Sequence, residues 1–492
     1  MGCRIPFGTS LFRLYSDIGI LSYIAMIAAL TIALLMLALA AMSAIGLGFA
    51  PLALLAIAGI VPASDIAVAI VNRSISLSVG GRLLPGLELR GGVTADLKTI
   101  IVMPTLLVDA ASIDEQIDRL EEHHLGNPDA HFSFALMSDW LDAPSEHLDD
   151  DQQLLDQAAA GIDRLNALYG PGANGPRFLL LHRERVWNEG EKRWIGWERK
   201  RGKLRELNRL LRGATDTSFM AIAGAAPTVP ANIRYVITLD VDTRMPIGTA
   251  RRLVGKMAHP LNQPEFDPRS GLVLQGHGML QPRVTPSLPF GSEGSLFQRV
   301  FSGPNGLDPY ALAVSDVYQD LFEEGSFTGK GIYDVDSFEA ALRGQFPESA
   351  VLSHDLLEGI FARATLVSDI EVVEEFPSRY AVAAARQHRW VRGDWQLLPW
   401  LFPHVPYEDP AQGVTTIPND LAPIDRWKIF DNMRRSLLSP MLLAFFIAGW
   451  TFFARRSLAV DAACRIGAIH LTANGADKMA LCAFCSWAMS YE

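Results

Sequence analysis

Long apolar runs lie towards both ends of the chain and indicate membrane-spanning helices. No charged residue occurs between Asp17 and Asp65, and this interval is long enough for two spans of roughly 20 residues each. Glycine and proline residues near its middle can form a turn, so we predict a transmembrane hairpin over about 20–43 and 48–69. Arginines precede and follow the hairpin, which favours a cytoplasmic position for both of its ends. The alternative is one span followed by an apolar core helix.

A third apolar run covers residues 436–454 and predicts another transmembrane helix. Arginine pairs stand on both sides of it, at 434–435 and 455–456, and leave its direction across the membrane open. Residues 455–492 show no clear periodicity, so we expect an irregular C-terminal tail. Residues 1–94 are accordingly assigned to the membrane hairpin and a cytoplasmic interface segment.

Between residues 95 and 435 the pattern changes to short apolar runs separated by helical periodicities. The apolar runs predict buried strands at 99–103, 132–137, 178–181 and 235–239. Strands that alternate with helices favour an α/β fold in which helices cover both faces of a mostly parallel sheet. We therefore predict one α/β domain over 95–435, with ligands bound beyond the carboxyl ends of its strands.

The overall charge argues against one class of function. The 492 residues carry a formal net charge of -11 and no lysine- or arginine-rich stripe, which opposes binding to nucleic acid. The hydrophobic fraction of 49% is high for a soluble protein and agrees with the predicted membrane helices. The four cysteines do not form a disulfide framework in a chain of this size. Cys482 and Cys485 lack the second ligand pair that a zinc site needs.

Acidic residues follow two of the predicted strands. Asp139 comes just after the strand at 132–137, while Asp240 and Asp242 come directly after the strand at 235–239. Because the carboxyl ends of parallel strands meet at one edge of a sheet, we expect these acids to converge on one crevice. Two carboxylates one residue apart can bind Mg²⁺ or Mn²⁺, and such a cation can hold a nucleotide diphosphate. For Asp139, a turn or helix cap is the alternative role.

The Asp-x-Asp pattern alone is weak, because a second copy lies at Asp334 and Asp336. That copy follows a glycine-rich loop, 325–331, rather than a strand end, so we assign it to acceptor-side structure or to a turn. The loop does not have the spacing of a Walker A motif. Its Gly329 and Lys330 are candidates for substrate binding, because glycine lets a polar ligand approach the backbone closely.

Two later segments complete a candidate sugar-diphosphate site. Asp355 lies at an element boundary and is available to take a proton from an attacking hydroxyl, with helix capping as the alternative. Gln387, Arg389 and Trp390 then combine an amide, a guanidinium and an indole within about one helical turn. Arginine can hold phosphate oxygens, and an indole offers a flat apolar face to a sugar ring. We expect Glu358, one turn beyond Asp355, to be solvated.

This order of motifs resembles the processive, membrane-embedded inverting glycosyltransferases with a GT-A fold, the class that contains cellulose and hyaluronan synthases. The resemblance implies that Asp139 contacts the nucleotide base and that Asp355 is the general base. It assigns the metal-diphosphate site to Asp240 and Asp242. It also implies substrate-binding roles for Lys203, Asn208, Gln387, Arg389 and Trp390.

Two positions depart from the pattern of that class. His354 stands where an acid usually precedes the general base, and Arg386 stands where the class has a glutamine. The first departure leaves open whether any carboxylate neighbours the base. The second leaves open what the side chain at position 386 contacts.

Four stretches, at 62–68, 327–336, 353–359 and 386–395, resemble a narrower family. This is the transferase module of bacterial cyclic β-1,2-glucan synthases, glycosyltransferase family 84, and the resemblance covers about residues 50–450. It implies UDP-glucose as donor, a growing β-1,2-glucan as acceptor, and a divalent cation. It further implies a multi-pass protein of the bacterial cytoplasmic membrane, with the transferase domain in the cytoplasm.

Members of that family carry a phosphorylase-like region after the transferase, and we expect this region outside the present sequence. Two alternatives stay open at this point. One is a synthase of a different β-glycan, because donor and linkage depend on pocket shape. The other is a truncated, non-catalytic membrane module that binds a nucleotide sugar.

Overall fold

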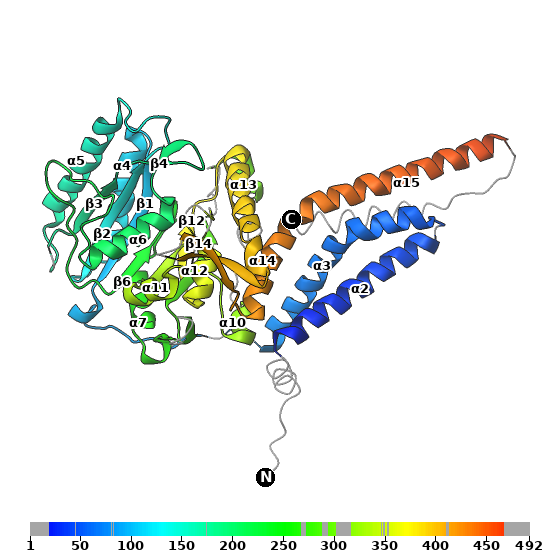
Figure 1. The fold of residues 1–492 in the computed structure, drawn as a ribbon, viewed down its shortest axis with the longest axis horizontal. Coiled ribbons are helices and arrows are strands. Elements are labelled where there is room, and N and C mark those ends of the chain that lie inside the picture. Colours follow the sequence, from blue (N-terminus) through cyan, green and yellow to red (C-terminus); the bar gives the residue numbers. More distant parts are fainter. Residues whose placement is uncertain are drawn as a thin grey trace, which may run out of the picture. The chain divides into compact units, whose positions relative to one another are not determined.

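The computed structural model describes residues 19–44, 46–79, 81, 83–173, 175–266, 272–287, 294–301, 316–345, 347, 350–351, 354–409 and 413–466 (Figure 1). The chain divides into two compact units. One combines residues 1–80 with 430–492, and the other covers 81–429. Cys482, Cys485 and most of the predicted tail lie outside the described residues.

The first unit contains long apolar helices. Helix α2 spans Ile20–Ala44 and helix α3 spans Phe49–Val79, and both are long and apolar enough to cross a membrane. The predicted pair of apolar helices is therefore confirmed. The two helices pack together, and the Tyr23 hydroxyl on α2 donates a hydrogen bond of 2.7 Å to Asn72 Oδ1 on α3.

The third predicted span is divided by a bend. Helix α14 covers Pro423–Ser436 and helix α15 covers Leu438–Ile466, and their axes differ by 43°. Over the described ranges the chain thus has two helices with the length and composition of a membrane span, or three if this bent pair forms one broken span. The apolar run predicted at 436–454 lies mainly on α15.

The second unit is built on one eight-stranded sheet with the order β3-β2-β1-β6-β11-β10-β12-β7. Its first four strands are β1 (Thr99–Leu107), β2 (Phe132–Trp140), β3 (Phe178–Arg183) and β6 (Tyr235–Thr238), and they pair in parallel. The others are β7 (Thr243–Arg244), β10 (Met279–Pro286), β11 (Gly331–Asp334) and β12 (Ala364–Glu374). Only β11 and β7 run against the common direction. The sheet is mostly parallel, as predicted.

Alternating side chains of β1 explain why both faces of the sheet are covered. Ile101 and Met103 enter one apolar cluster, whereas Ile100 and Val102 enter the other, as the two-residue period of a strand requires. Three helices contribute side chains to the first cluster: α4 (Ala110–Gly126), α5 (Asp151–Tyr169) and α7 (Thr249–Met257). The second receives helices α6 (Arg199–Leu211) and α11 (Val335–Leu342). The predicted α/β class, with helices on both faces, is confirmed.

The remaining elements surround this sheet (Figure 1). Their bounds are β4 Val186–Asn188, β5 Arg193–Ile195, β8 Glu265–Phe266, β9 Val273–Gln275, β13 His404–Asp409, β14 Gly413–Pro418, α8 Leu296–Phe301, α10 Val317–Phe322, α12 Asp355–Phe361 and α13 Tyr380–Gln396.

Candidate functional site

The loop after β6 carries Asp240 and Asp242 to the end of β12. The short strand β7 follows this loop and pairs antiparallel with β12, with Thr243 opposite Glu374. The backbone N–H of Glu375 donates to the carbonyl of Asp242 at 2.9 Å. Two strand ends that are far apart in the sequence therefore present acids at one place.

Asp240 lies between two lysines. Its Oδ1 is 2.6 Å from Lys200 Nζ, and its Oδ2 is 3.0 Å from Lys330 Nζ. Lys200, near the start of α6, also donates a 2.8 Å hydrogen bond to the carbonyl of Gly329 in the glycine-rich loop. Burial alone would raise the pKa of Asp240, but the charges of both lysines outweigh it and hold that pKa well below its usual range. Asp240 therefore stays ionised.

Asp242 is joined to the same cluster through Arg386. The guanidinium of Arg386 donates to Asp242 Oδ2 and, at 2.9 Å, to Glu374 Oε1. The other oxygen of Glu374 lies 2.7 Å from Lys330 Nζ. Burial, Glu374 and Asp240 raise the pKa of Asp242 against the opposing charge of Arg386.

These contacts form one continuous ionic network in which cations and carboxylates alternate. It runs through Lys200, Asp240, Lys330, Glu374, Arg386 and Asp242. The sequence predicted the two aspartates and Lys330, but not Lys200 or Glu374, and it left the contact of Arg386 open. Glu374 had a signal of the same kind as Asp240, because it ends a strand with the sequence Val372-Val373-Glu374.

The network provides carboxylates for a cation but not a complete protein-made cage. In the described part of the chain, no group of three or more His, Cys, Asp or Glu side chains is arranged to hold a metal ion. Mg²⁺ commonly takes one or two carboxylates together with substrate phosphates. The residues present thus fit a cation site that is only partly made of protein ligands.

Asp355, the first residue of α12, lies against the glycine-rich loop. A Cβ atom added to Gly329 would be 2.8 Å from Asp355 Oδ2. Burial raises the pKa of Asp355, and Asp240 adds to this rise, while Lys200 and Lys330 oppose it. The structure therefore brings Asp355, Asp240 and Gly329 close together.

Two residues near this acid in the sequence, His354 and Glu358, are buried. His354, with 5% of its surface exposed, precedes α12, and its Nε2 lies 3.2 Å from a guanidinium nitrogen of Arg201. Glu358, one turn after Asp355, is 3% exposed, so the prediction that it is solvated is wrong. The reason is that Glu358 faces the protein interior from α12. Burial together with the charge of Asp355 raises the pKa of Glu358.

Asp139 and Lys203 form a separate buried cluster at the ends of β2 and β3. Asp139 accepts two hydrogen bonds from Arg183, of 2.8 and 2.9 Å, and its Oδ2 lies 3.1 Å from Lys203 Nζ. Lys203 also donates to the carbonyls of Thr105 and Met137, at 2.7 and 3.1 Å. The polar atoms of these two predicted substrate-binding residues are thus engaged inside the protein.

Asn208 is not brought to the ionic network. Its side chain donates to Glu339 at 2.8 Å and accepts from the Tyr333 hydroxyl at 3.0 Å, and the residue is fully buried. Eight residues separate it from Lys200 on α6, which corresponds to about 12 Å along a helix axis. Its observed contacts join α6 to β11 and α11.

Helix α13 supplies the predicted Gln387, Arg389 and Trp390. Gln387 and Arg389 are exposed. Trp390 is 39% exposed, and its ring centroid lies 5.5 Å from the Arg386 guanidinium carbon. Residues 386 and 390 share one face of the helix because they are four positions apart. Through Arg386, this face joins the ionic network.

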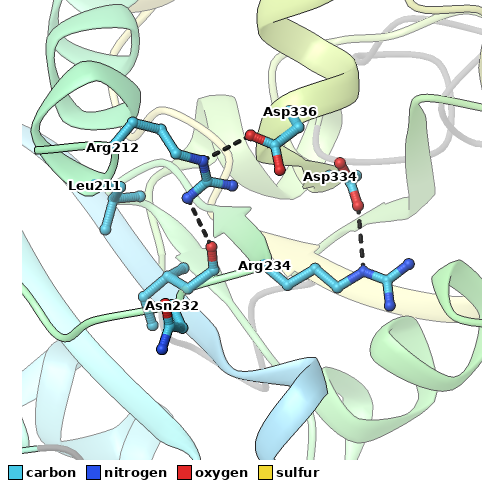
Figure 2. A pocket seen from close by; sticks show the side chains of 7 residues that line it. Leu211, Arg212, Asn232, Arg234, Asp334 and Asp336 are labelled. Atoms are coloured by element: carbon cyan, nitrogen blue, oxygen red, sulfur yellow. Dashed lines mark hydrogen bonds and ion pairs between the residues drawn. The ribbon is translucent and has the colours of Figure 1, made fainter.

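The second Asp-x-Asp lies at the opposite end of β6 from Asp240, and Figure 2 shows it beside Arg212 and Arg234. Asp334 ends β11 and pairs with Tyr235, the first residue of β6, so the expectation that it does not follow a strand is wrong. It accepts from the backbone N–H of Ser337 at 3.1 Å and thereby caps α11. Asp336 is 2.6 Å from Arg212, beside a cavity of about 620 Å³. The second Asp-x-Asp is therefore separated from Asp240, which follows the other end of β6.

Comparison with known proteins agrees with the resemblance predicted from the sequence. No protein-family model matches the chain. Over 391 residues, or 80% of its length, the chain is 49% identical to the cyclic β-(1,2)-glucan synthase NdvB of Rhizobium meliloti (strain 1021). The chain is therefore homologous to part of a cyclic β-1,2-glucan synthase. It spans only 13% of the length of that relative.

A solved structure was also matched. It is the mannosyltransferase PcManGT from Pyrobaculum calidifontis in complex with GDP-Man and Mn²⁺. The match covers 84% of this chain and 92% of that one, with 14% identity and a TM-score of 0.44. A likeness at this level supports no conclusion about the present chain.

Proposed function

We propose that this chain is a membrane-bound inverting glycosyltransferase that transfers glucose from UDP-glucose to a growing β-1,2-glucan. The 49% identity to part of a cyclic β-1,2-glucan synthase supports this substrate class. The observation that carries the proposal is the position of Asp355. It lies against Gly329, whose carbonyl accepts from the same lysine that binds Asp240.

The diphosphate of the donor is proposed to bind at the ionic network. Lys200, Lys330 and Arg386 place three positive groups beside Asp240 and Asp242, and a diphosphate carries the complementary charge. A divalent cation bound by Asp240 and Asp242 would neutralise charge on the leaving diphosphate. The loop carbonyl of Gly329 keeps Lys200 oriented towards this place.

Asp355 is proposed to be the general base. It takes the proton from the 2-hydroxyl of the acceptor, whose oxygen forms a bond to C1 of the donor glucose. The bond between C1 and the diphosphate oxygen breaks, and UDP leaves with that electron pair. Attack on the α-linked donor from the opposite face gives a β bond.

The other predicted residues are proposed to act around this centre. Trp390 offers a flat face to a sugar ring, and the exposed Gln387 and Arg389 can reach phosphate oxygens. Asp139 and Lys203, being engaged inside the protein, are proposed to fix the strand ends near the nucleotide. Asn208, given its contacts with Tyr333 and Glu339, is proposed to hold α6 in place.

The apolar helices α2 and α3 support a position in the membrane. We place the protein in the bacterial cytoplasmic membrane with residues 95–435 in the cytoplasm, where a nucleotide sugar is available. The arginines that flank the predicted hairpin support this orientation.

Substitution of Asp355 by asparagine tests the proposed base. Asp355→Asn should abolish glucose transfer and leave UDP binding nearly intact, because the amide cannot take the proton. Asp336→Asn is the matched control, since Asp336 lies near the opposite end of β6 from Asp240 and is 75% exposed. Near-normal turnover in Asp355→Asn would remove Asp355 from this role.

A further inference from the structure

Arg386 shares its guanidinium between two carboxylates that belong to different strand ends. It donates to Asp242 after β6 and to Glu374 at the end of β12. Asp242 is 31% exposed, whereas the side chain of Glu374 is 4% exposed. A ligand that arrives from solvent can therefore reach the ion pair of Arg386 with Asp242, whereas the ion pair of Arg386 with Glu374 lies inside the protein.

The charges of the ion-paired groups in the network are balanced, with Asp355 outside these ion pairs. Its three carboxylates are those of Asp240, Asp242 and Glu374, and its three cationic groups are those of Lys200, Lys330 and Arg386. A divalent cation added alone would give this balanced group an excess of two positive charges. A diphosphate that arrives with the cation would cancel the excess, so the two ligands should favour each other's binding.

Arg386 also has contacts that would hold it after Asp242 is released. Glu374 Oε1 accepts from its Nη1 at 2.9 Å, and its guanidinium carbon lies 5.5 Å from the centroid of the Trp390 ring. Neither of these two contacts involves the Asp242 carboxylate. The side chain can therefore give up one partner without becoming unpaired in a buried place.

We infer that Arg386 is a built-in counter-cation of Asp242 that competes with the divalent cation for this carboxylate. Without the donor, Arg386 is ion-paired with Asp242. When cation and diphosphate bind together, Arg386 breaks this ion pair and keeps its contacts with Glu374 and Trp390. The consequence is that the cation binds weakly until a nucleotide diphosphate is present. This inference rests on the proposed function, because it assumes that a cation and a diphosphate use this site.

The test is Mn²⁺ binding to the purified full chain in detergent, measured by electron paramagnetic resonance with and without UDP. Arg386→Gln removes the competing charge and keeps a planar polar group. It should tighten Mn²⁺ binding without UDP by about five- to tenfold. It should also reduce the factor by which UDP strengthens Mn²⁺ binding, because that coupling depends on charge balance.

Three variants control this measurement. Arg386→Lys keeps the charge and should leave Mn²⁺ affinity near that of the wild type. Arg392→Gln alters an exposed arginine of the same helix and should change nothing. Asp242→Asn should weaken Mn²⁺ binding, which shows that the measured cation uses this carboxylate. Thermal unfolding of each variant shows that it remains folded.

The inference is overturned if Arg386→Gln binds Mn²⁺ no more tightly than the wild type does, or if Asp242→Asn leaves the affinity unchanged. Glucose incorporation from UDP-glucose by the wild type is measured on the same preparation. Its absence would contradict the proposed function, whereas an unchanged Mn²⁺ affinity in Arg386→Gln, with normal incorporation and a weakened Asp242→Asn, would contradict only the role of Arg386. The two failures are therefore distinguishable.

Discussion

Gly329 and Asp355 are so close that a Cβ atom at position 329 would lie 2.8 Å from the Asp355 Oδ2 atom. Gly329 also has a φ of +84°, a conformation that favours glycine. This pair links the glycine-rich loop, through the carbonyl that accepts from Lys200, to the proposed base. The loop therefore determines both where the base lies and where Lys200 points.

Gly329→Ala should displace the carboxylate of Asp355 and reduce glucose transfer by about tenfold or more, because small misplacements of a reacting group are costly. The matched control is Gly213→Ala. Gly213 has a similar φ of +88°, but a Cβ there would meet nothing within 4 Å. Both variants should lose about 1 kcal/mol of stability from backbone strain, and only Gly329→Ala should lose activity. Equal activities would show that the close approach is unimportant.

Substitution of the two lysines of α6 should separate binding from folding. Lys200→Met removes one of the two lysines that pair with Asp240 and the donor to the Gly329 carbonyl, so UDP affinity should fall by about tenfold while the protein stays folded. Lys203→Met leaves buried acceptors on Thr105 and Met137, which should cost about 3 kcal/mol of stability. UDP titration and thermal unfolding measure the two effects. If Lys203→Met lowered UDP affinity and Lys200→Met only lowered stability, Lys203 would be the lysine that binds the diphosphate.

The activity should fall on the acid side because the proposed base must be ionised. Burial raises the pKa of Asp355, and Lys200 lowers it, so transfer should be lost as the pH falls through a pKa above the usual aspartate range. Lys200→Met removes the opposing charge and should move this acid limb of kcat/KM to higher pH. A pH profile of both proteins checks the shift. An acid limb that stays in place, or moves down, would exclude electrostatic contact between Lys200 and the base.

Glu358 should make the folded protein less stable as the pH rises. Burial and the charge of Asp355 raise its folded pKa above the value of 4.5 for a free side chain. The native state therefore holds a proton that the unfolded state releases, and the stability falls as the pH rises from about 4.5 through the raised pKa. Glu358→Gln cannot titrate and should show a flatter Tm profile over this interval. Parallel Tm profiles of the two proteins would contradict this account.

The sequence predicted the acids of the site better than their partners. Asp240 and Asp242 end an apolar run, and the order of later motifs pointed to Asp355. The partners join segments that are distant in the sequence, such as Arg386 and Asp242, which are 144 positions apart. Such a pairing depends on how β7 meets β12 and on the placement of α13, which local periodicity does not specify.

Lys200 and Lys203 differ in their surroundings for a simple geometric reason. The two residues lie about one turn apart on α6. Lys200 is in the first turn of the helix and reaches the loop of Gly329, whereas Lys203 is 3% exposed against the ends of β1 and β2. Sequence spacing alone could not distinguish the two lysines, because the burial of each helical turn depends on how far α6 extends beyond the sheet.

The central claim is tested most directly by incubating membranes that contain this chain with labelled UDP-glucose and Mn²⁺, then determining the linkage of the product. Asp355→Asn membranes serve as the control for background synthesis. We expect incorporation into a glucan with β-1,2 linkages in the wild type and none above background in the variant. Incorporation into another linkage would contradict the proposed product, and no incorporation would contradict the proposed transferase activity.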